Sequence, residues 1–155
     1  MKRGIYTDTS VIGGCLDVEF RGPSLELLGL FESGKAIIVL SDLTRLELEA
    51  GPPAVRQVLS GLAQANREYV ELTKEASELA DRYIEAGVLS RSKRVDAQHI
   101  AVATLARVDV LVSWNFRHIV NLDRIRGYNS VNMKYGYPLI EIRTPREVIS
   151  HGAYD

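Results

Sequence analysis

Cysteine is nearly absent from this 155-residue sequence, which contains Cys15 alone. A single cysteine excludes an internal disulfide and a cysteine-rich zinc site, and it is typical of a protein kept in a reducing compartment. No apolar run approaches the roughly 20 residues that a membrane-spanning helix needs. The basic start Met1-Lys2-Arg3 is not followed by an apolar segment of signal-peptide length. We therefore expect a cytoplasmic protein without membrane contact.

An excess of charge of one sign is also missing, because 19 Lys and Arg stand against 20 Asp and Glu. This balance excludes a globally basic nucleic-acid-binding protein, although it permits a local basic patch. The run Gly13-Gly14-Cys15 is not a phosphate-binding G-x-G-x-x-G motif, so a nucleotide-binding domain lacks support. Repeats, low-complexity tracts and linker-like segments are absent too. We expect residues 1–155 to form one domain.

The spacing of apolar residues predicts strands and helices in alternation. The predicted strands are a short one at Ile5-Tyr6 and those over 36–41, 108–113 and 138–144; the predicted helices cover 24–33, 43–50, 54–65, 74–87, 97–108 and 145–150; residues 121–136 are a predicted loop. The strand AIIVLS, residues 36–41, is apolar on both faces, which favours a parallel sheet covered on two sides. The predicted fold class is therefore three-layer α/β/α with a mainly parallel central sheet.

Four oxygen-bearing side chains are predicted to meet at one edge of this sheet. Asp8 lies two residues past the first predicted strand, and Asn115 lies two residues past the strand over 108–113. Glu47 lies in the helix that follows AIIVLS, and Asp96 opens the alanine-rich helix, whose positive N-terminus favours a carboxylate. Ligands of open parallel sheets bind beyond the carboxyl ends of the strands, which is where these groups should converge.

The position of Glu47 depends on the helix over 43–50. Leu43 and Leu46 are predicted to form its buried stripe, which places Glu47 at the border of that stripe. Each acid also has an ordinary structural interpretation, because aspartate commonly caps helices and forms turns. The pattern alone leaves both interpretations open.

Convergent carboxylates repel one another unless they take up protons or a cation joins them. Oxygen ligands without cysteine or a paired histidine select hard ions, here Mg²⁺ or Mn²⁺. Such an ion lowers the pKa of bound water and holds a phosphodiester for in-line attack. The four side chains therefore favour the hypothesis of metal-dependent phosphodiester hydrolysis.

Four sequence blocks carry a family resemblance: YTDTSVIGG, SDLTRLELEAG, VDAQHIAVATLARVDVLVSWNFRHI and PLIEIRTPREVI. In order and spacing they resemble the PIN-domain family, and within it most closely the VapC-type ribonucleases of toxin–antitoxin pairs. The resemblance covers almost the whole chain. It implies a PIN-like three-layer fold and Mg²⁺- or Mn²⁺-dependent endoribonuclease activity on RNA. We also expect RNA as a partner, a homodimer and, for a toxin of such a pair, a cognate antitoxin.

The resemblance also implies roles for particular residues. The first aspartate of the family falls on Asp8, its helix glutamate on Glu47 and its third acid on Asp96. The fourth position, usually an aspartate after a strand that ends in Thr or Ser, falls on Asn115. An amide keeps an oxygen ligand but removes a negative charge, which weakens metal binding or leaves room for one ion only. The alternative is a catalytically weak PIN-like RNA-binding or scaffold protein.

Further candidate residues surround the acids. The candidates for substrate binding are Ser10, Ser113, Arg91, Lys93, Arg94, Arg117 and His118. Basic side chains attract RNA phosphates, and His118 could donate a proton to the leaving oxygen. The alternatives are a solvated loop for the basic segment, backbone capping for the serines and a structural role for His118. We interpret His99 as a satisfied, half-buried histidine, and Trp114 as either a base-stacking or, more simply, a buried side chain.

Two apolar helix faces remain ambiguous. Leu25, Leu28 and Phe31 share one face, and Leu79 and Tyr83 share another. Either face would serve as a homodimer or antitoxin interface, and core packing explains both equally well.

Overall fold

A computed structural model describes residues 2–150 and shows one sheet of five parallel strands. The strands are β1 (Arg3–Thr7), β2 (Ala36–Ser41), β3 (Arg67–Val70), β4 (Val110–Val112) and β5 (Ile142–Arg143). Their order in the sheet is β3-β2-β1-β4-β5, and every neighbouring pair is parallel. Strands β1 and β4, which precede Asp8 and Asn115 in the chain, are therefore adjacent within the sheet.

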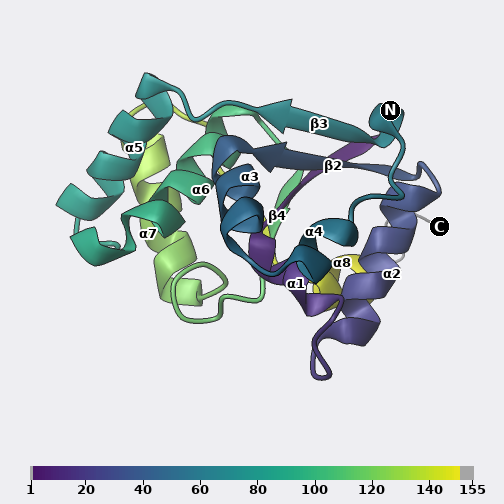
Figure 1. The fold of residues 1–155 in the computed structure, drawn as a ribbon. Helices are drawn as coiled ribbons and strands as arrows, with labels where there is room; N and C mark the ends of the chain where they lie inside the picture. Colours follow the sequence, from purple (N-terminus) through teal and green to yellow (C-terminus); the bar gives the residue numbers. More distant parts are fainter. Residues whose placement is uncertain (1, 151–155) are drawn as a thin grey trace.

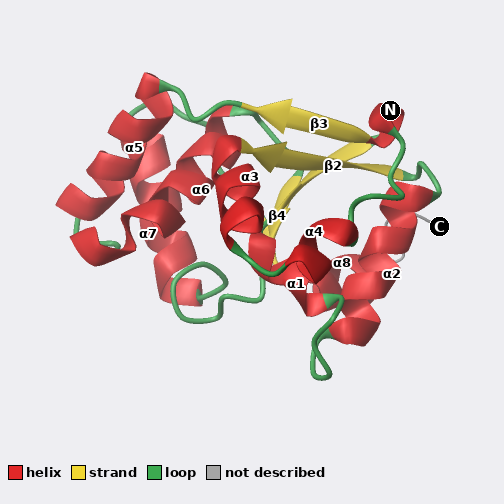
Figure 2. Cartoon of the chain, in the orientation of Figure 1, coloured by secondary structure: helices red, strands yellow, loops and turns green. Residues whose placement is uncertain are grey.

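Helices cover both faces of this sheet (Figures 1 and 2). The helices are α1 (Thr9–Gly14), α2 (Arg21–Glu32), α3 (Asp42–Ala50), α4 (Pro53–Gln57), α5 (Lys74–Glu85), α6 (Arg94–Leu105), α7 (Leu122–Lys134) and α8 (Pro145–Ser150), with short 3₁₀ turns η1 (Gln64–Asn66) and η2 (Arg91–Lys93). The three-layer α/β/α prediction is confirmed. None of the helices described within residues 2–150 combines the length and the apolarity that crossing a bilayer requires.

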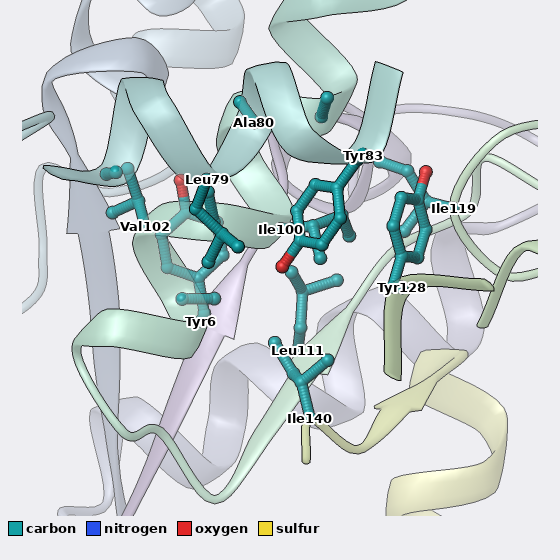
Figure 3. Close-up of a cluster of buried hydrophobic side chains, with 14 of the residues drawn as sticks. Tyr6, Leu79, Ala80, Tyr83, Ile100, Val102, Leu111, Ile119, Tyr128 and Ile140 are labelled. Atoms are coloured by element: carbon teal, nitrogen blue, oxygen red, sulfur yellow. The ribbon is translucent and has the colours of Figure 1, made fainter. Parts of the chain in front are cut away.

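Two apolar cores lie on opposite faces of the sheet, because successive strand residues point to opposite sides. In β1, Tyr6 belongs to the core beneath α5, α6 and α7, whereas Ile5 belongs to the core beneath α1, α2 and α4. In β4, Leu111 and Val112 divide in the same way. Figure 3 shows the first core, where side chains of α5 and α6 pack against Tyr6 and Leu111.

The prediction of a single helix over 54–65 is wrong. Helix α4 ends at Gln57, and turns lead to η1. The Ser60 hydroxyl bonds the Gln57 carbonyl at 2.7 Å, and the Arg67 guanidinium donates to the carbonyl of Leu62 at 2.6 Å. These side chains donate to carbonyls that would accept backbone N–H groups if the helix continued. Strand β3, which follows, was not predicted, because REYV is a polar edge strand with exposed central residues.

The predicted loop over 121–136 is also wrong, because most of it forms α7. The Asn121 side chain caps this helix by accepting hydrogen bonds from the backbone N–H groups of Asp123 and Arg124. Two of its polar residues, Tyr128 and Asn132, are buried and paired: Tyr128 donates to the carbonyl of His118 at 2.6 Å, and Asn132 accepts from the Tyr83 hydroxyl at 2.6 Å. The side chain of Asn129 forms hydrogen bonds with the backbone N–H and the backbone carbonyl of Ile140. Because these groups are used outside the sheet, the strand predicted over 138–144 is shortened to β5.

Candidate functional site

The candidate site lies at the carboxyl edge of the central strands. Asp8 leaves β1 as the residue before α1, and its backbone N–H donates to the carbonyl of Val112 at the end of β4 at 3.1 Å. Helix α3 begins directly after β2 and carries Glu47, while α6 carries Asp96 in its first turn. In Figure 1, α1, α3 and α6 gather beside the ends of β1 and β4.

Asp8 is buried, with 7% of its surface exposed, and two serine hydroxyls hold its carboxylate. Ser10 donates to Oδ2 at 2.9 Å and Ser113 donates to the same oxygen at 2.7 Å. Each hydroxyl in turn accepts a backbone N–H, Ser10 from Trp114 and Ser113 from Asn115. Since a hydroxyl has one proton to give, these backbone contacts direct both protons to Asp8. The serines therefore orient the carboxylate.

Glu47 approaches Asp8 from α3 and is held by two neighbours. Its Oε1 accepts a hydrogen bond from the Thr9 hydroxyl at 2.8 Å and lies 2.8 Å from Nε2 of His99. Burial works to raise the pKa of Glu47, but the hydrogen bond and the charge of His99 outweigh burial and lower it. Glu47 thus stays ionised in a partly buried place. The predicted buried stripe of this helix, Leu43 and Leu46, is only half correct, because Leu43 is buried but Leu46 is 58% exposed.

His99 belongs to the site, which the sequence analysis missed. Its ring is fully buried, and its Nδ1 lies 2.7 Å from the Tyr6 hydroxyl, which lies 2.7 Å from the Ser41 hydroxyl. Burial works to lower the pKa of His99, yet the hydrogen bond to Glu47 and the nearby carboxylates raise it. The signal was available: His99 follows Asp96 by three residues, and such residues share a helix face.

Asp8, Glu47 and His99 form a close group. One ligand atom from each lies within 4.8 Å of the other two, and Nε2 of His99 is 4.0 Å from Oδ1 of Asp8. Groups of this kind can hold a metal ion. The structure therefore brings together two of the four predicted ligands, with a histidine beside them.

Asp96 lies near this group but outside it. Burial raises its pKa, and the negative charge of Asp8 raises it further, whereas His99, His118 and Lys93 pull it down. Asp96 is thus within electrostatic reach of Asp8. A cation between these carboxylates would relieve the repulsion.

Asn115 uses its side chain locally. Its Oδ1 accepts the backbone N–H of His118 at 3.0 Å, and its backbone carbonyl accepts from Ile119 and Val120. The amide oxygen therefore closes the turn after β4, as asparagine side chains commonly do. This position does place Asn115 at the site edge, two residues from the Ser113 hydroxyl.

The basic candidates divide into two groups. The positive charge of Lys93 lowers the pKa of Asp96 and of His118, and the charge of Arg117 lowers the pKa of His118. Both basic side chains therefore border the site. Arg94 turns to Asp81 on α5, with two hydrogen bonds at 3.0 and 3.4 Å, and ties α6 to α5. Arg91 is exposed on η2.

The negative charge of Asp96 acts on the imidazole of His118, which few other contacts hold in place. Loss of water contact lowers its pKa, and Lys93 and Arg124 lower it further, while Asp96 works in the opposite direction. Among residues 2–150 no hydrogen-bond partner lies within reach of its buried Nδ1. A neutral imidazole with an open nitrogen beside an acid is compatible with proton transfer.

The apolar candidates fit core packing. Trp114 is buried and donates its Nε1–H to the Ser24 hydroxyl at 2.9 Å, so the simpler interpretation of this residue is correct. Phe31, Leu79 and Tyr83 are buried in the two cores, whereas Leu25 is exposed. The buried members of the two helix faces cannot form an interface.

The contact between Glu47 and His99 predicts how stability depends on pH in the metal-free protein. The lowered pKa of Glu47 contributes stability above its ordinary value of 4.5, and this is lost as pH falls through the folded pKa. The raised pKa of His99 contributes stability below its ordinary value of 6.5, and this is lost as pH rises through the folded pKa. Both contributions are therefore complete between those values.

This prediction is checked by urea unfolding in EDTA across the pH range. The difference in unfolding free energy between the wild type and His99→Gln should be largest between pH 4.5 and 6.5 and should shrink on either side. A difference that does not vary with pH would show that the contact is not an ion pair.

Comparison with known proteins gives structural similarity only. Neither a protein-family model nor a curated protein sequence matches this chain. Solved structures do match, and one of them is the crystal structure of VapBC2 from Rickettsia felis bound to a DNA fragment from their promoter. It aligns with a TM-score of 0.55 over 91% of this chain and 98% of the matched chain, at 14% sequence identity. This similarity supports the fold, an α/β domain with a parallel sheet that is consistent with a PIN-like architecture.

Proposed function

We propose that this protein is a divalent-metal-dependent endoribonuclease of the VapC type, in which Asp8, Glu47 and Asp96 are the acidic ligands. The observation that carries the proposal is the convergence of Asp8 and Glu47 at the carboxyl edge of a parallel sheet, near enough to Asp96 for the charge of Asp8 to raise its pKa. Ligands of such sheets bind at this edge. The structural similarity to VapBC2 agrees with the same assignment.

The donor set fits Mg²⁺ or Mn²⁺, which prefer carboxylate and other oxygen ligands. Both serine hydroxyls bind Oδ2 of Asp8, and the other oxygen, Oδ1, lies on the side of His99 and Glu47. Asn115 could add its amide oxygen through the lone pair that the His118 N–H leaves free. A divalent ion would offset the carboxylate charges, polarise the phosphodiester and activate the attacking water.

His99 has a supporting role in this proposal. Its Nε2 lies at hydrogen-bond distance from Glu47, so it holds this carboxylate in place rather than acting as an ion ligand. Such outer partners orient ligands and tune metal affinity. Behind it, Tyr6 and Ser41 fix the ring from the buried side.

RNA is the proposed substrate, a cognate antitoxin is the proposed partner, and we keep the homodimer as a proposal. Lys93 and His118 lie near Asp96, Arg117 lies near His118, and these side chains would attract phosphate groups. Arg94 is engaged with Asp81 and contributes less. His118 is the proposed proton donor to the leaving oxygen, and it would act in its protonated form, which the charge of Asp96 favours and which burial and the nearby cations disfavour.

The test is a metal titration of the purified protein. Labelled single-stranded RNA should be cleaved with Mg²⁺ or Mn²⁺ and remain intact with EDTA. Since a ligand that binds only the folded state stabilises it, Mn²⁺ at about 100 times its Kd should add about 2.7 kcal/mol to the unfolding free energy. Metal-dependent stabilisation without cleavage, or RNA retention in EDTA, would favour the catalytically weak RNA-binding alternative and contradict the enzyme.

A further inference from the structure

Three aromatic rings lie together next to the candidate site. Phe20, in the segment between α1 and α2, stacks on Trp114 with ring centroids 4.4 Å apart and planes inclined by 23°. The ring of Phe116 lies 6.0 Å from that of Trp114 and 6.3 Å from that of Phe20. Trp114 is buried, but Phe116 is 52% exposed. Phe116 therefore rests against a packed aromatic pair and presents much of its surface to solvent.

Core packing does not explain the exposed part of Phe116. Phe20 and Trp114 already fill the space between α2 and the end of β4, where the indole also bonds Ser24. A half-exposed phenylalanine gains only part of the free energy of apolar burial. Exposed aromatic residues are typical of surfaces that bind a ligand.

The position of Phe116 links it to the acids. Its neighbour Asn115 donates its backbone N–H to Ser113, and Ser113 holds Asp8. Phe116 follows Ser113 by three residues, so their Cα atoms are at most about 11 Å apart. This short connection to a residue that holds Asp8 places Phe116 at the border of the candidate site, where a nucleotide next to the scissile bond would lie.

The charges around this ring match a nucleic acid better than an apolar peptide. Arg117 follows Phe116 directly, and its charge acts on His118, which faces Asp96. Exposed aromatic surface beside cationic side chains is the combination by which proteins bind single strands, because bases stack while phosphates pair with the cations.

We propose that Phe116 is a nucleobase-stacking residue: an unpaired base next to the scissile phosphodiester stacks on its exposed surface. Phe20 and Trp114 support the ring from behind and keep it from turning away. This inference rests on the proposed function for its substrate. Because any base offers a π-face, Phe116 would set the register of the strand more than the identity of the base.

The test is a double-mutant cycle between the protein and the RNA. The scissile bond of a labelled single-stranded oligonucleotide is first mapped with the wild type, and an abasic ribose is then placed beside it. Phe116→Ala should lower kcat/KM on intact RNA about tenfold, as loss of one stacked base does. The abasic RNA should be cleaved equally poorly by the wild type and by Phe116→Ala, while Phe116→Trp should retain cleavage of intact RNA.

The exposed Leu139 provides the matched control. It lies before the start of β5, at the amino edge of the sheet and so away from the carboxyl edge that forms the site. Leu139→Ala should leave both rates unchanged. Independent, additive losses from Phe116→Ala and from the abasic site would overturn the inference. So would unchanged RNA cleavage in Phe116→Ala combined with weaker binding of a copurifying protein, because the ring would then belong to a protein interface.

Failure of the proposed function is distinguishable from failure of this inference. If the wild type cleaves no RNA in Mn²⁺, the nuclease proposal fails, and the same cycle is measured as oligonucleotide affinity by fluorescence anisotropy. A coupling between Phe116 and the base in that measurement supports stacking without catalysis. No coupling overturns the stacking proposal as well.

Discussion

Replacing Asp8 by asparagine should abolish RNA cleavage while leaving the metal-free protein folded and at least as stable as the wild type. Asparagine has nearly the same shape, and its amide oxygen still accepts hydrogen bonds from the hydroxyls of Ser10 and Ser113. The charge disappears, and with it the effect that, after burial, raises the pKa of Asp96. Loss of several kcal/mol of metal-assisted stabilisation corresponds to a rate decrease of at least about 10³-fold.

Two measurements check this result. Cleavage of labelled RNA in Mn²⁺ gives the rate, and thermal unfolding with and without Mn²⁺ gives the stability. The metal should raise the Tm of the wild type but not that of Asp8→Asn. The control is Asp109→Asn, because Asp109 bonds the Gly4 N–H outside the site and should leave cleavage unchanged. Undiminished cleavage by Asp8→Asn would end the assignment of this carboxylate.

The strands and helices that the sequence predicts correctly are those that pack through apolar side chains. Strand β2 occupies the predicted range Ala36–Ser41, because six residues covered on both faces leave few alternatives. The helix around Leu79 and Tyr83 was predicted from its apolar stripe and is α5. Hydrophobic spacing is thus sufficient where burial is apolar.

Prediction failed where polar side chains do the packing. The segment that became α7 has few apolar residues, and it is buried through hydrogen bonds of Tyr128, Asn129 and Asn132. Those bonds join residues from 10 to 49 positions apart, so no local pattern encodes them. Polar composition was therefore misinterpreted as a loop.

The candidate site shows the same division. Asp8 and Asn115 could be placed from topology alone, because the carboxyl ends of parallel strands share one edge. The contact of Glu47 with His99 spans 52 residues and depends on how α3 and α6 pack. For the same reason the sequence could not show that the amide of Asn115 closes its own turn.

Replacing Asn132 by alanine should destabilise the protein by about 2–3 kcal/mol, although it removes a polar residue from a segment that resembles a loop. Asn132 is fully buried, and its Oδ1 accepts the Tyr83 hydroxyl at 2.6 Å while Nδ2 lies 3.4 Å from the Thr104 hydroxyl. Alanine leaves the Tyr83 hydroxyl buried without a partner and opens a small cavity, and both effects cost free energy.

The double variant with Tyr83→Phe separates the hydrogen bond from the packing. Tyr83→Phe alone leaves Oδ1 of Asn132 unpaired, but in the Asn132→Ala background it removes the orphan hydroxyl. The two losses in urea-unfolding free energy should therefore be less than additive, by about 1 kcal/mol or more. Gln57→Ala, at an exposed residue, should change stability by less than about 0.5 kcal/mol. Strictly additive losses would mean that apolar packing alone, rather than this buried polar network, holds α7 against α5 and α6.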